Sequence, residues 1–433
     1  FAASWRLRAG RWRRRRGLRR DFGATVSITA ADIMARCDQL AVVSDTPGLI
    51  RRVYLSPEHA RVNAMAAGWM REAGMTSWTD AAGNQWGRYE GAEPDAPALV
   101  LGSHLDTVTD AGRYDGILGV MLGIGVVARL HERGQRLPFA VEVVAFGDEE
   151  GTRFGTALLG SRAVAGTWDD HWWDIEDANG IRLDEAFVTF GLEPGRVEDA
   201  ARTPADLVGY LEAHIEQGPE LLEAHRPVGV VSSIAGARRF AITVEGTAGH
   251  AGTPWERRRD ALAAASEMIL AVERIARHDD AVATVGRISV HPGGVNIIPG
   301  RAEFSLDLRG RDDATRDRIR GELLGAFVEI AGRRDVTFAI DGRHTAPAAI
   351  ASTRLQAAIA AGVVATGDAE PMVLWSRAGH DAMAIAAITE FGMLFTRCGN
   401  GGISHHPDES VTVEDVAVAL TAFEAAVLAV AAG

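Results

Sequence analysis

Residues 98–116 have the sequence ALVLGSHLDTVTDAGRYDG, and residues 141–151 have the sequence VEVVAFGDEEG. In each stretch an apolar, β-rich run is followed closely by histidine or acidic side chains. Such runs are typical of strands that are buried on both faces of a parallel sheet. Chemistry in open α/β sheets collects at the carboxyl ends of the strands. We therefore predict an α/β fold in which these polar side chains share one edge of the sheet.

The composition excludes several classes of function. The formal net charge is −13 although the first 20 residues hold nine arginines and no acid, so the remainder is strongly acidic and argues against a nucleic-acid groove. The chain contains no lysine, which excludes a Schiff-base lysine, a phosphate-loop lysine and a Ser–Lys dyad. No apolar run approaches the length of about 18 residues that a membrane span needs, so no membrane association is expected.

The two cysteines and the amino-terminal segment indicate the cellular compartment. Cys37 and Cys398 are far apart and outside any metal-type spacing, so we expect reduced thiols in a reducing compartment, the cytoplasm. The arginine-rich head, residues 1–26, lacks the strong apolar region of a secretory signal. We expect this head to be a disordered tail. A targeting segment and a polyanion-binding arm are the alternatives.

The pattern of the chain changes near residue 232, and a chain of 433 residues predicts two domains. Apolar and polar residues alternate at 240–245 and 304–309, as in antiparallel strands with one wet face. Helical patterns follow each of these stretches. We therefore predict a mixed, mostly parallel catalytic sheet flanked by helices, with an inserted α+β, ferredoxin-like domain. The predicted boundaries are 1–26 for the head, 27–232 and 349–433 for the catalytic domain, and 233–348 for the insert.

The first polar cluster has the residue types of a metal site. His104 and Asp106 are two positions apart on an extended strand end, so their side chains lie on one face. The imidazole can bind a metal ion while the carboxylate holds its other ring nitrogen and fixes the tautomer. Asp115, in a turn before Gly116, can bridge two cations with its two oxygens. Two cations about 3.5–4 Å apart activate a water for attack on a carbonyl.

The second polar cluster supplies a ligand and a base. Glu149 and Glu150 are adjacent, so on an extended chain they cannot face the same way. One can bind a cation while the other acts as general base. His214 and a late histidine would complete the two ligand sets. An isolated His-x-Asp pair is often a surface coincidence, and a Glu-Glu pair is often a solvated helix end, so the prediction depends on the ordered set.

The ordered set resembles the M20 metallohydrolase family over nearly the whole chain beyond the head. Within that family the chain is most similar to the amidase branch, which contains allantoate amidohydrolases, N-carbamoyl-L-amino-acid hydrolases and β-ureidopropionases. The stretches that carry the resemblance are GSHLDTVTDAGRYDGILGV (102–120), FGDEEGTRF (146–154), HIEQGP (214–219), GHAGTP (249–254), NIIPG (296–300), DLR (307–309), AGHDAM (378–383) and GGISHHPDE (401–409).

The resemblance implies two divalent ions per subunit, Zn or Mn, with Co or Ni as alternatives. The implied residues are His104, Asp115 and His214 for one ion; Asp115, Glu150 and His405 for the other; Glu149 as base; Asp106 to orient His104; and Gln217, His250, Asn296 and Arg309 for the substrate. His405 is preferred to His406 because the family pattern has Ser-His before the proline turn. In the family the histidine at the place of His250 comes from the partner subunit's lid. A homodimer is therefore implied, with the insert as lid and dimerisation domain.

The chemistry of these substrate contacts agrees with the resemblance. Arg309 lies on the polar face of its strand, and a guanidinium fork suits a substrate carboxylate. His250, close to Gly249 and Gly252, could donate to a developing oxyanion. The residues alone leave Arg309 equally open as a surface cation and Asn296 as a turn residue.

We expect a hydrolase that cleaves a carbamoyl or ureido C–N bond of a small carboxylated substrate, with allantoate first. N-carbamoyl-L-amino acids and β-ureidopropionate are the alternative substrates. A homologue that binds metal without catalysis is an alternative of another class, but such relatives commonly lose a ligand or the base, and Glu149 and the five ligands are all present. A peptidase or deacylase of the wider family would lack the Gln217–Asn296–Arg309 set in this arrangement.

Two departures from the family pattern affect the expected substrate site. The family usually has one more residue between Thr253 and Pro254, and a methionine where Trp255 stands. Arg377 replaces a usual glycine before Ala378. The loop that carries His250 and the rim of the pocket are therefore expected to differ from those of the relatives.

Overall fold

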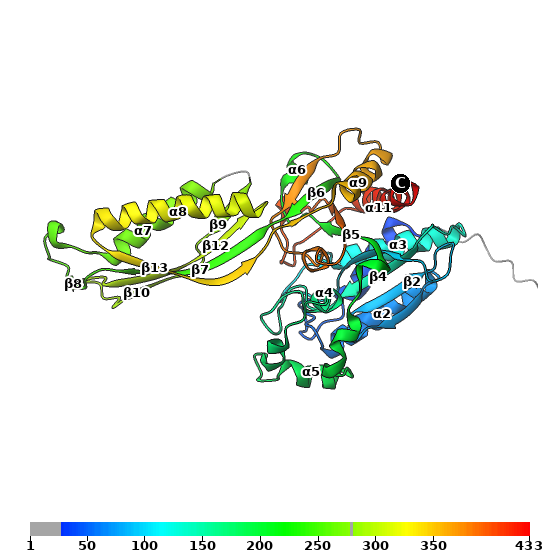
Figure 1. The fold of residues 1–433 in the computed structure, drawn as a ribbon, viewed down its shortest axis with the longest axis horizontal. Helices are drawn as coiled ribbons and strands as arrows, with labels where there is room; N and C mark the ends of the chain where they lie inside the picture. Colours follow the sequence, from blue (N-terminus) through cyan, green and yellow to red (C-terminus); the bar gives the residue numbers. More distant parts are fainter. Residues whose placement is uncertain (1–26, 278–279) are drawn as a thin grey trace, which may run out of the picture.

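The computed structural model describes residues 27–277 and 280–433; the arginine-rich head, 1–26, lies outside them. Figure 1 shows a large part built on one sheet, from which an elongated second part extends. We call residues 236–346 the arm and the other described residues the body. The arm has its own hydrophobic core, separate from the cores of the body.

The body is built on a mixed sheet in the order β1-β2-β4-β3-β5-β16-β6-β14, with β15 paired to β6. The strands are β1 Thr76–Thr79, β2 Gln85–Tyr89, β3 Ala98–His104, β4 Ala140–Phe146, β5 Leu207–Ile215, β6 Val228–Ile234, β14 Ala349–Ile350, β15 Val373–Ser376 and β16 Phe391–Thr396. The α/β class and the mixed sheet are confirmed. Parallel pairing occurs in the centre, β4-β3-β5-β16, and between β15 and β6, so the expectation of a mostly parallel sheet is met only in part. A hairpin adds β1 and β2 antiparallel at one side, and β16 is antiparallel to β6 at the other.

Helices cover both faces of the body sheet. They are α1 Ala30–Ala41, α2 Pro57–Glu72, α3 Ile117–Glu132, α4 Leu159–Val164, α5 Leu183–Phe190, α6 Glu220–Glu223, α9 Thr353–Ala365, α10 Ala382–Ile385 and α11 Val413–Ala432, with 3-10 turns η1 Asp170–Asp174, η2 Pro194–Ala200, η3 Pro204–Asp206 and η5 Asn400–Gly402. Leu99 and Leu101 of β3 join the core that contains α3, whereas Val100 joins the core on the opposite face. The uninterrupted apolar run of β3 is therefore explained by burial on both sides.

Helix α11 departs from one expectation. It is long and apolar enough to cross a membrane by length and composition, and the expectation that no such run exists is wrong. Half of its apolar window is buried inside the protein. Leu420, Phe423 and Val427 belong to the main core, beside Leu355 and Ile359 of α9. These contacts are those of a core helix in a globular protein.

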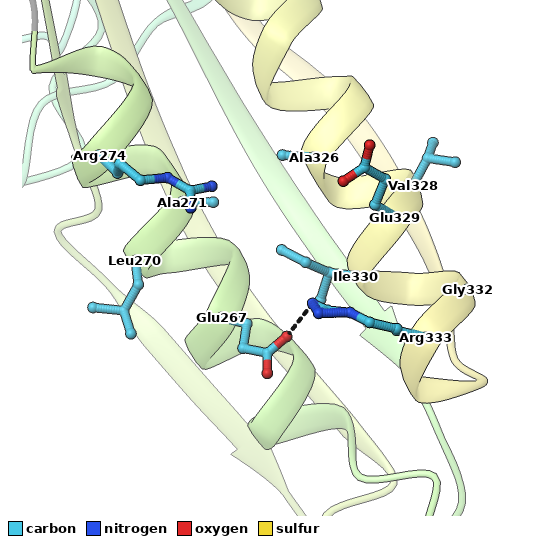
Figure 2. A pocket seen from close by; sticks show the side chains of 10 residues that line it. All are labelled: Glu267, Leu270, Ala271, Arg274, Ala326, Val328, Glu329, Ile330, Gly332 and Arg333. Carbon is cyan, nitrogen blue, oxygen red and sulfur yellow. Dashed lines mark hydrogen bonds and ion pairs between the residues drawn. The ribbon is translucent and has the colours of Figure 1, made fainter.

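The arm is an antiparallel sheet in the order β10-β12-β7-β13, with β9 paired to β12. Its elements are β7 Gly236–Glu245, β8 Gly249–His250, η4 Trp255–Arg257, α7 Ala261–Ala276, β9 Ala281–Thr284, β10 Ile288–His291, β11 Ile297–Ile298, β12 Arg301–Gly310, α8 Asp313–Arg334 and β13 Thr337–Ala346. The apolar side chains of β12 pack beneath α7 and α8, and its alternate residues face the other side. A groove of about 820 Å³ lies between α7 and α8 (Figure 2). β8 pairs with β11 in a small ribbon that Figure 1 shows at the end of the arm farthest from the body.

Close packing of α3 on the sheet depends on Gly119. A Cβ atom at this position would overlap the carbonyl oxygen of Ala213 in β5. Gly123, one turn on, has more room, with Val143 Cγ1 at 3.3 Å from such an atom. The approach of α3 to the sheet is therefore closest at Gly119.

We predict that Gly119→Ala lowers the free energy of unfolding by about 1–3 kcal/mol, because α3 must move away from β5. Gly68→Ala is the matched control, since open space surrounds Gly68 in α2, and it should stabilise the protein by up to about 1 kcal/mol. Denaturant unfolding of the two variants measures both effects. Equal stabilities would contradict the packing argument.

Candidate metal centre

Two buried histidines lie at the ends of neighbouring parallel strands. His104 is the last residue of β3 and His214 is near the end of β5, and their rings are 5.7 Å apart. Nδ1 of His104 lies 3.1 Å from the carbonyl oxygen of Asp106, and Nδ1 of His214 lies 2.9 Å from the carbonyl oxygen of Ile215. A ring nitrogen that faces a carbonyl carries the proton in a neutral imidazole. Nε2 of each ring therefore keeps a lone pair for a metal ion.

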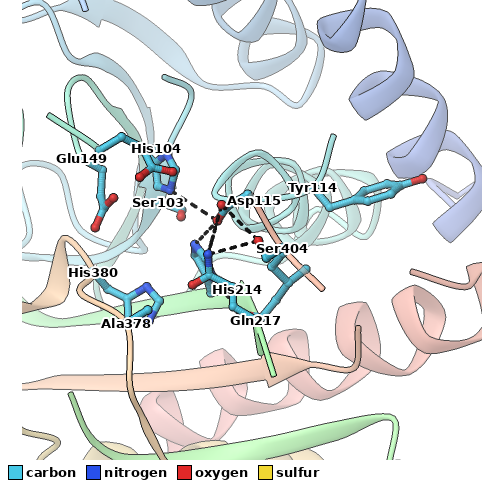
Figure 3. Close-up of polar contacts among 12 residues, drawn as sticks. Ser103, His104, Tyr114, Asp115, Glu149, His214, Gln217, Ala378, His380 and Ser404 are labelled. Atoms are coloured by element: carbon cyan, nitrogen blue, oxygen red, sulfur yellow. Dashed lines mark hydrogen bonds and ion pairs between the residues drawn. The ribbon is translucent and has the colours of Figure 1, made fainter. Parts of the chain in front are cut away.

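Asp115 lies between three imidazoles. Its Oδ1 is 3.3 Å from Nε2 of His214 and 4.0 Å from Nε2 of His104. Its Oδ2 is 3.1 Å from Nε2 of His405. Figure 3 shows His104 and His214 gathered around Asp115. A carboxylate whose two oxygens face different ligands has the arrangement that bridges two cations.

Two groups of possible ligand atoms share Asp115. The atoms of each group lie within 4.8 Å of one another; the groups are His104, Asp115 and His214, and Asp115, Glu150 and His405. In the second group Glu150 Oε1 is 3.4 Å from His405 Nε2. Imidazole nitrogens and carboxylate oxygens are donors that suit Zn²⁺ and Mn²⁺. The residues present therefore fit divalent ions.

The adjacent histidines of the last loop differ in placement. His405 has a φ of +55°, and this backbone conformation presents its ring to Asp115 and Glu150. His406 instead accepts at Nδ1 from the backbone N–H of Asp408, 3.1 Å away, and is exposed. The structure thus brings His405, and not His406, to the other ligands.

The carboxylate of Asp106 accepts hydrogen bonds from the backbone of Glu149 and Glu150 and lies farther from His104. Its two carboxylate oxygens accept from the backbone N–H groups of Glu149 and Glu150, each at 3.1 Å. The nearer oxygen is 3.6 Å from His104 Nδ1, which is closer to the carbonyl of Asp106 itself. The carbonyl and the carboxylate of Asp106 therefore both face Nδ1 of His104, with the carbonyl nearer, and the orienting role of the carboxylate stays a prediction. The N–H groups of the turn after β4 are additional partners of that carboxylate.

Gly116 makes room for the imidazole of His104. It lies between Asp115 and α3 with a φ of +72°, in the left-handed region that favours glycine. A Cβ atom here would also overlap Nε2 of His104. Glycine at position 116 is therefore favoured both by the backbone conformation and by the imidazole beside it.

Burial and the neighbouring polar groups together set the ionisation of this centre. Burial raises the pKa of Glu149 well above its usual value and also raises the pKa of Glu150. Burial lowers the pKa of His214 to about 4, which keeps its imidazole neutral. Hydrogen bonds to Asp115 and Glu150 raise the pKa of His405 to about 11. Burial acts to raise the pKa of Asp115, but His405 and the neighbouring imidazoles outweigh it and lower that pKa. Carboxylates held this deeply are stabilised by cationic partners.

Glu409 is a buried residue of the site that the sequence analysis did not single out. Its Oε1 accepts from the backbone N–H groups of Tyr114 at 2.8 Å and Asp115 at 3.2 Å, and its Oε2 accepts from Ser404 Oγ at 2.8 Å. Gln217 donates from Nε2 to both oxygens of Asp115, each at 3.0 Å. Gln217 therefore touches the central carboxylate itself. Glu409 lies in the quoted stretch GGISHHPDE, but a Pro-Asp-Glu sequence alone is typical of a solvated turn.

The loop after β15 closes another side of the centre. His380 packs edge-on against His214, with ring centroids 4.5 Å apart, and its Nε2 is 2.7 Å from Ser376 Oγ. A Cβ atom on Gly379 would lie 3.9 Å from Oε1 of Glu149. This loop therefore borders Glu149, which belongs to neither of the two ligand groups that contain Asp115.

Arg309 joins the arm to this loop. It donates from Nη1 to the carbonyl oxygen of Arg377 at 2.8 Å and from Nε to Asp307 at 3.1 Å. The Arg377 side chain forms an ion pair with Glu220 and stacks on Trp375 at 4.8 Å. The charge of Arg377 is therefore matched by Glu220, and Arg309 is the guanidinium that faces the junction of arm and body.

His250 and Asn296 are not brought to this centre within one chain. His250 belongs to β8, at the far end of the arm (Figure 1). The carbonyl oxygen of Asn296 accepts from the backbone N–H of Ala251 at 2.9 Å, so the two residues lie together. The sequence predicted both as substrate contacts, and the structure places them away from the other site residues.

Comparisons with known proteins give one family. The model of peptidase family M20/M25/M40 matches residues 100–429. Allantoate deiminase 1 of Glycine max is 38% identical over 89% of this chain and 86% of its own length. The N-carbamoyl-L-amino acid amidohydrolase of Geobacillus stearothermophilus is 42% identical over 88% of this chain and 94% of its own length. The crystal structure of a hydantoinase/carbamoylase family amidase from Burkholderia multivorans aligns with a TM-score of 0.85 and 31% identity, covering 94% of this chain and 99% of that one.

We predict that Asp106→Ala weakens divalent metal binding by about 10- to 100-fold, because the turn that carries Glu149 and Glu150 loses its acceptor. Competition of the chelator-treated protein with a chromophoric chelator measures the affinity. Asp38→Ala is the control, since Asp38 pairs with Arg113 at the exposed surface. Affinities that are equal in the two variants would show that Asp106 has no part in the centre.

Proposed function

Because the chain belongs to peptidase family M20/M25/M40, we propose that it hydrolyses a carbamoyl or ureido C–N bond of a small carboxylated substrate. The observation that supports this most is the pair of ligand groups that share Asp115, with Glu149 beside them. His104 and His214 would complete the first ion site with Asp115. Glu150 and His405 would complete the second.

When bound, the two divalent ions would polarise the scissile carbonyl and supply a water acidic enough to react at neutral pH. Glu149 would take a proton onto its carboxylate from that water and deliver it to the leaving nitrogen. Its burial supports this role, since the raised pKa makes the carboxylate a stronger base. Glu149 is buried, and the loop at Gly379 lies beside it.

The carboxylated end of the substrate is assigned to Arg309. Asp307 and the carbonyl of Arg377 engage Nε, Nη1 and Nη2 of its guanidinium. A guanidinium has five N–H donors, so two remain for an anion. The side chain of Arg377, on the neighbouring loop, forms its ion pair with Glu220.

Among the substrates of the branch we favour allantoate. Residues 110–115 and 393–407 resemble allantoate enzymes more than carbamoylases, and the soybean relative is an allantoate deiminase. The Geobacillus relative acts on N-carbamoyl-L-amino acids, which are the second candidates. A catalytically inactive homologue is disfavoured because Glu149 and all five ligand positions are retained.

We propose that two copies associate, so that His250 and Asn296 of one chain reach the metal centre of the other. Their place at the far end of the arm supports this arrangement. The groove between α7 and α8 is the proposed contact face. Leu270 and Val328 on this face are 65% and 62% exposed, and Arg274 and Glu329 offer charges of opposite sign (Figure 2). A face with both signs around an apolar centre suits a two-fold contact with itself.

The division into a catalytic domain of 27–232 and 349–433 and an inserted lid and dimerisation domain of 233–348 is part of this proposal. A cytoplasmic location is also proposed, since Cys37 and Cys398 are both free and buried.

We predict that Glu149→Gln lowers kcat by about 100- to 10,000-fold, because the general base is lost. Bound metal should stay at the wild-type amount, as measured by elemental analysis. Glu198→Gln, an exposed change of the same kind, should leave kcat unchanged. Substantial activity in Glu149→Gln would remove Glu149 from the role of base.

An ammonia-release assay should show the highest kcat/KM for allantoate, with N-carbamoyl-L-amino acids and β-ureidopropionate compared under the same conditions. Arg309→Ala should raise KM for whichever substrate is used, because the carboxylate contact is lost. Inactivity on all three compounds by the metal-loaded protein would overturn the proposed function.

A further inference from the structure

The loop that carries His250 is held by few contacts at an exposed end of the molecule. His250 itself is exposed, and the chain turns back through a hydrogen bond from the N–H of Thr253 to the carbonyl of His250 at 2.9 Å. Pro254 and the 3-10 turn η4 follow. A loop this open needs some interaction to give the imidazole a defined direction.

The first such interaction sets the tautomer of the ring. The backbone N–H of Gly252 donates to Nδ1 of His250 at 3.0 Å. A neutral imidazole that accepts at Nδ1 carries its proton on Nε2. Nε2–H then becomes the donor that the ring offers outward. This is the tautomer that can donate to an oxyanion developing on a substrate.

The second interaction comes from Arg258. Its Nη2 donates to the carbonyl of Ala251 at 2.6 Å, and its Nε donates to the carbonyl of Thr253 at 2.8 Å. The face of Trp255 covers the guanidinium, with 3.8 Å between the guanidinium carbon and the ring centre. Among residues 27–277 and 280–433, no carboxylate lies within ion-pair distance of Arg258. The guanidinium of Arg258 therefore forms its hydrogen bonds with backbone carbonyls of this one loop.

The two interactions meet on a single peptide group. The carbonyl of Ala251 and the N–H of Gly252 belong to the same planar trans peptide and point in opposite directions. Arg258 holds the carbonyl side of that plane, and the ring of His250 accepts from its N–H side. A rotation of the plane would break both bonds together.

We propose that Arg258 is a positioning residue that fixes the tautomer and direction of His250 through the peptide between Ala251 and Gly252. The proposal rests on the proposed function in one respect, the role of His250 at the metal centre. Trp255 supports this arrangement by shielding the guanidinium of Arg258 on one side.

The kinetic test is a double-mutant cycle on the full-length, metal-loaded protein. Arg258→Ala should lower kcat by about 10- to 100-fold with little change in KM, as expected for a misplaced catalytic group. In the His250→Ala background the same change should have almost no effect. Arg258→Lys should recover only a small part of kcat, since an ammonium lacks the rigid fork. Arg257→Ala, an exposed neighbour, should match wild type.

An equal loss of kcat from Arg258→Ala in both backgrounds would overturn the proposal. Thermal unfolding of each variant shows whether a loss arises from instability instead, and a loss explained wholly by instability would also overturn it.

The spectroscopic test does not depend on activity. In protein labelled with ¹⁵N-histidine, the signals absent from His250→Ala identify His250, and two-bond couplings report which ring nitrogen carries the proton. Wild type should show the Nε2–H form, and Arg258→Ala should show a mixture. An unchanged tautomer in Arg258→Ala would contradict the proposal. If His250→Ala retains full activity, the assigned role of His250 fails, while this measurement still decides the role of Arg258.

Discussion

The parallel pairing of β3 with β4 and β5 is the constraint on which the rest of the structure depends. It sets the carboxyl ends of three strands side by side, so that His104, the turn at Glu149 and His214 meet although they are far apart in the sequence. The pairing is enforced by burial on both faces, since alternate side chains of β3 enter different cores. Gly119 then lets α3 approach closely enough to carry Asp115 into the same space.

Asp115 turns this meeting point into one centre. Its oxygens face His214 on one side and His405 on the other, while Glu409 and Gln217 hold its backbone and side chain. The buried acids around it leave an excess of negative charge that divalent cations would balance. In the proposed function, the arm would add the groups that select a substrate, with Arg309 at its base and His250 at its end.

The sequence predicted the parts of this molecule that local patterns determine. The apolar runs of β3 and β4 predicted that both strands are buried and pair in parallel. The alternation of apolar and polar residues at 304–309 predicted β12. A mixed body sheet was predicted, but not which of its strands are antiparallel, because edge pairing depends on distant segments. Glu409 was missed because nothing near it in the sequence shows that it is buried. The role of Asp106 was only partly predicted, since its competing N–H donors come from residues 43 and 44 positions away. Helix α11 shows that an apolar stretch long enough to span a membrane can form a core helix of a globular protein.

We propose that one carboxylate, Asp115, joins two metal sites. Elemental analysis of the full-length protein, reconstituted with Zn²⁺ or Mn²⁺ and freed of excess metal, tests it most directly. We expect two ions per chain in the wild type, one in His214→Ala and none in Asp115→Ala. One ion per chain in the wild type, or two ions retained by Asp115→Ala, would contradict it.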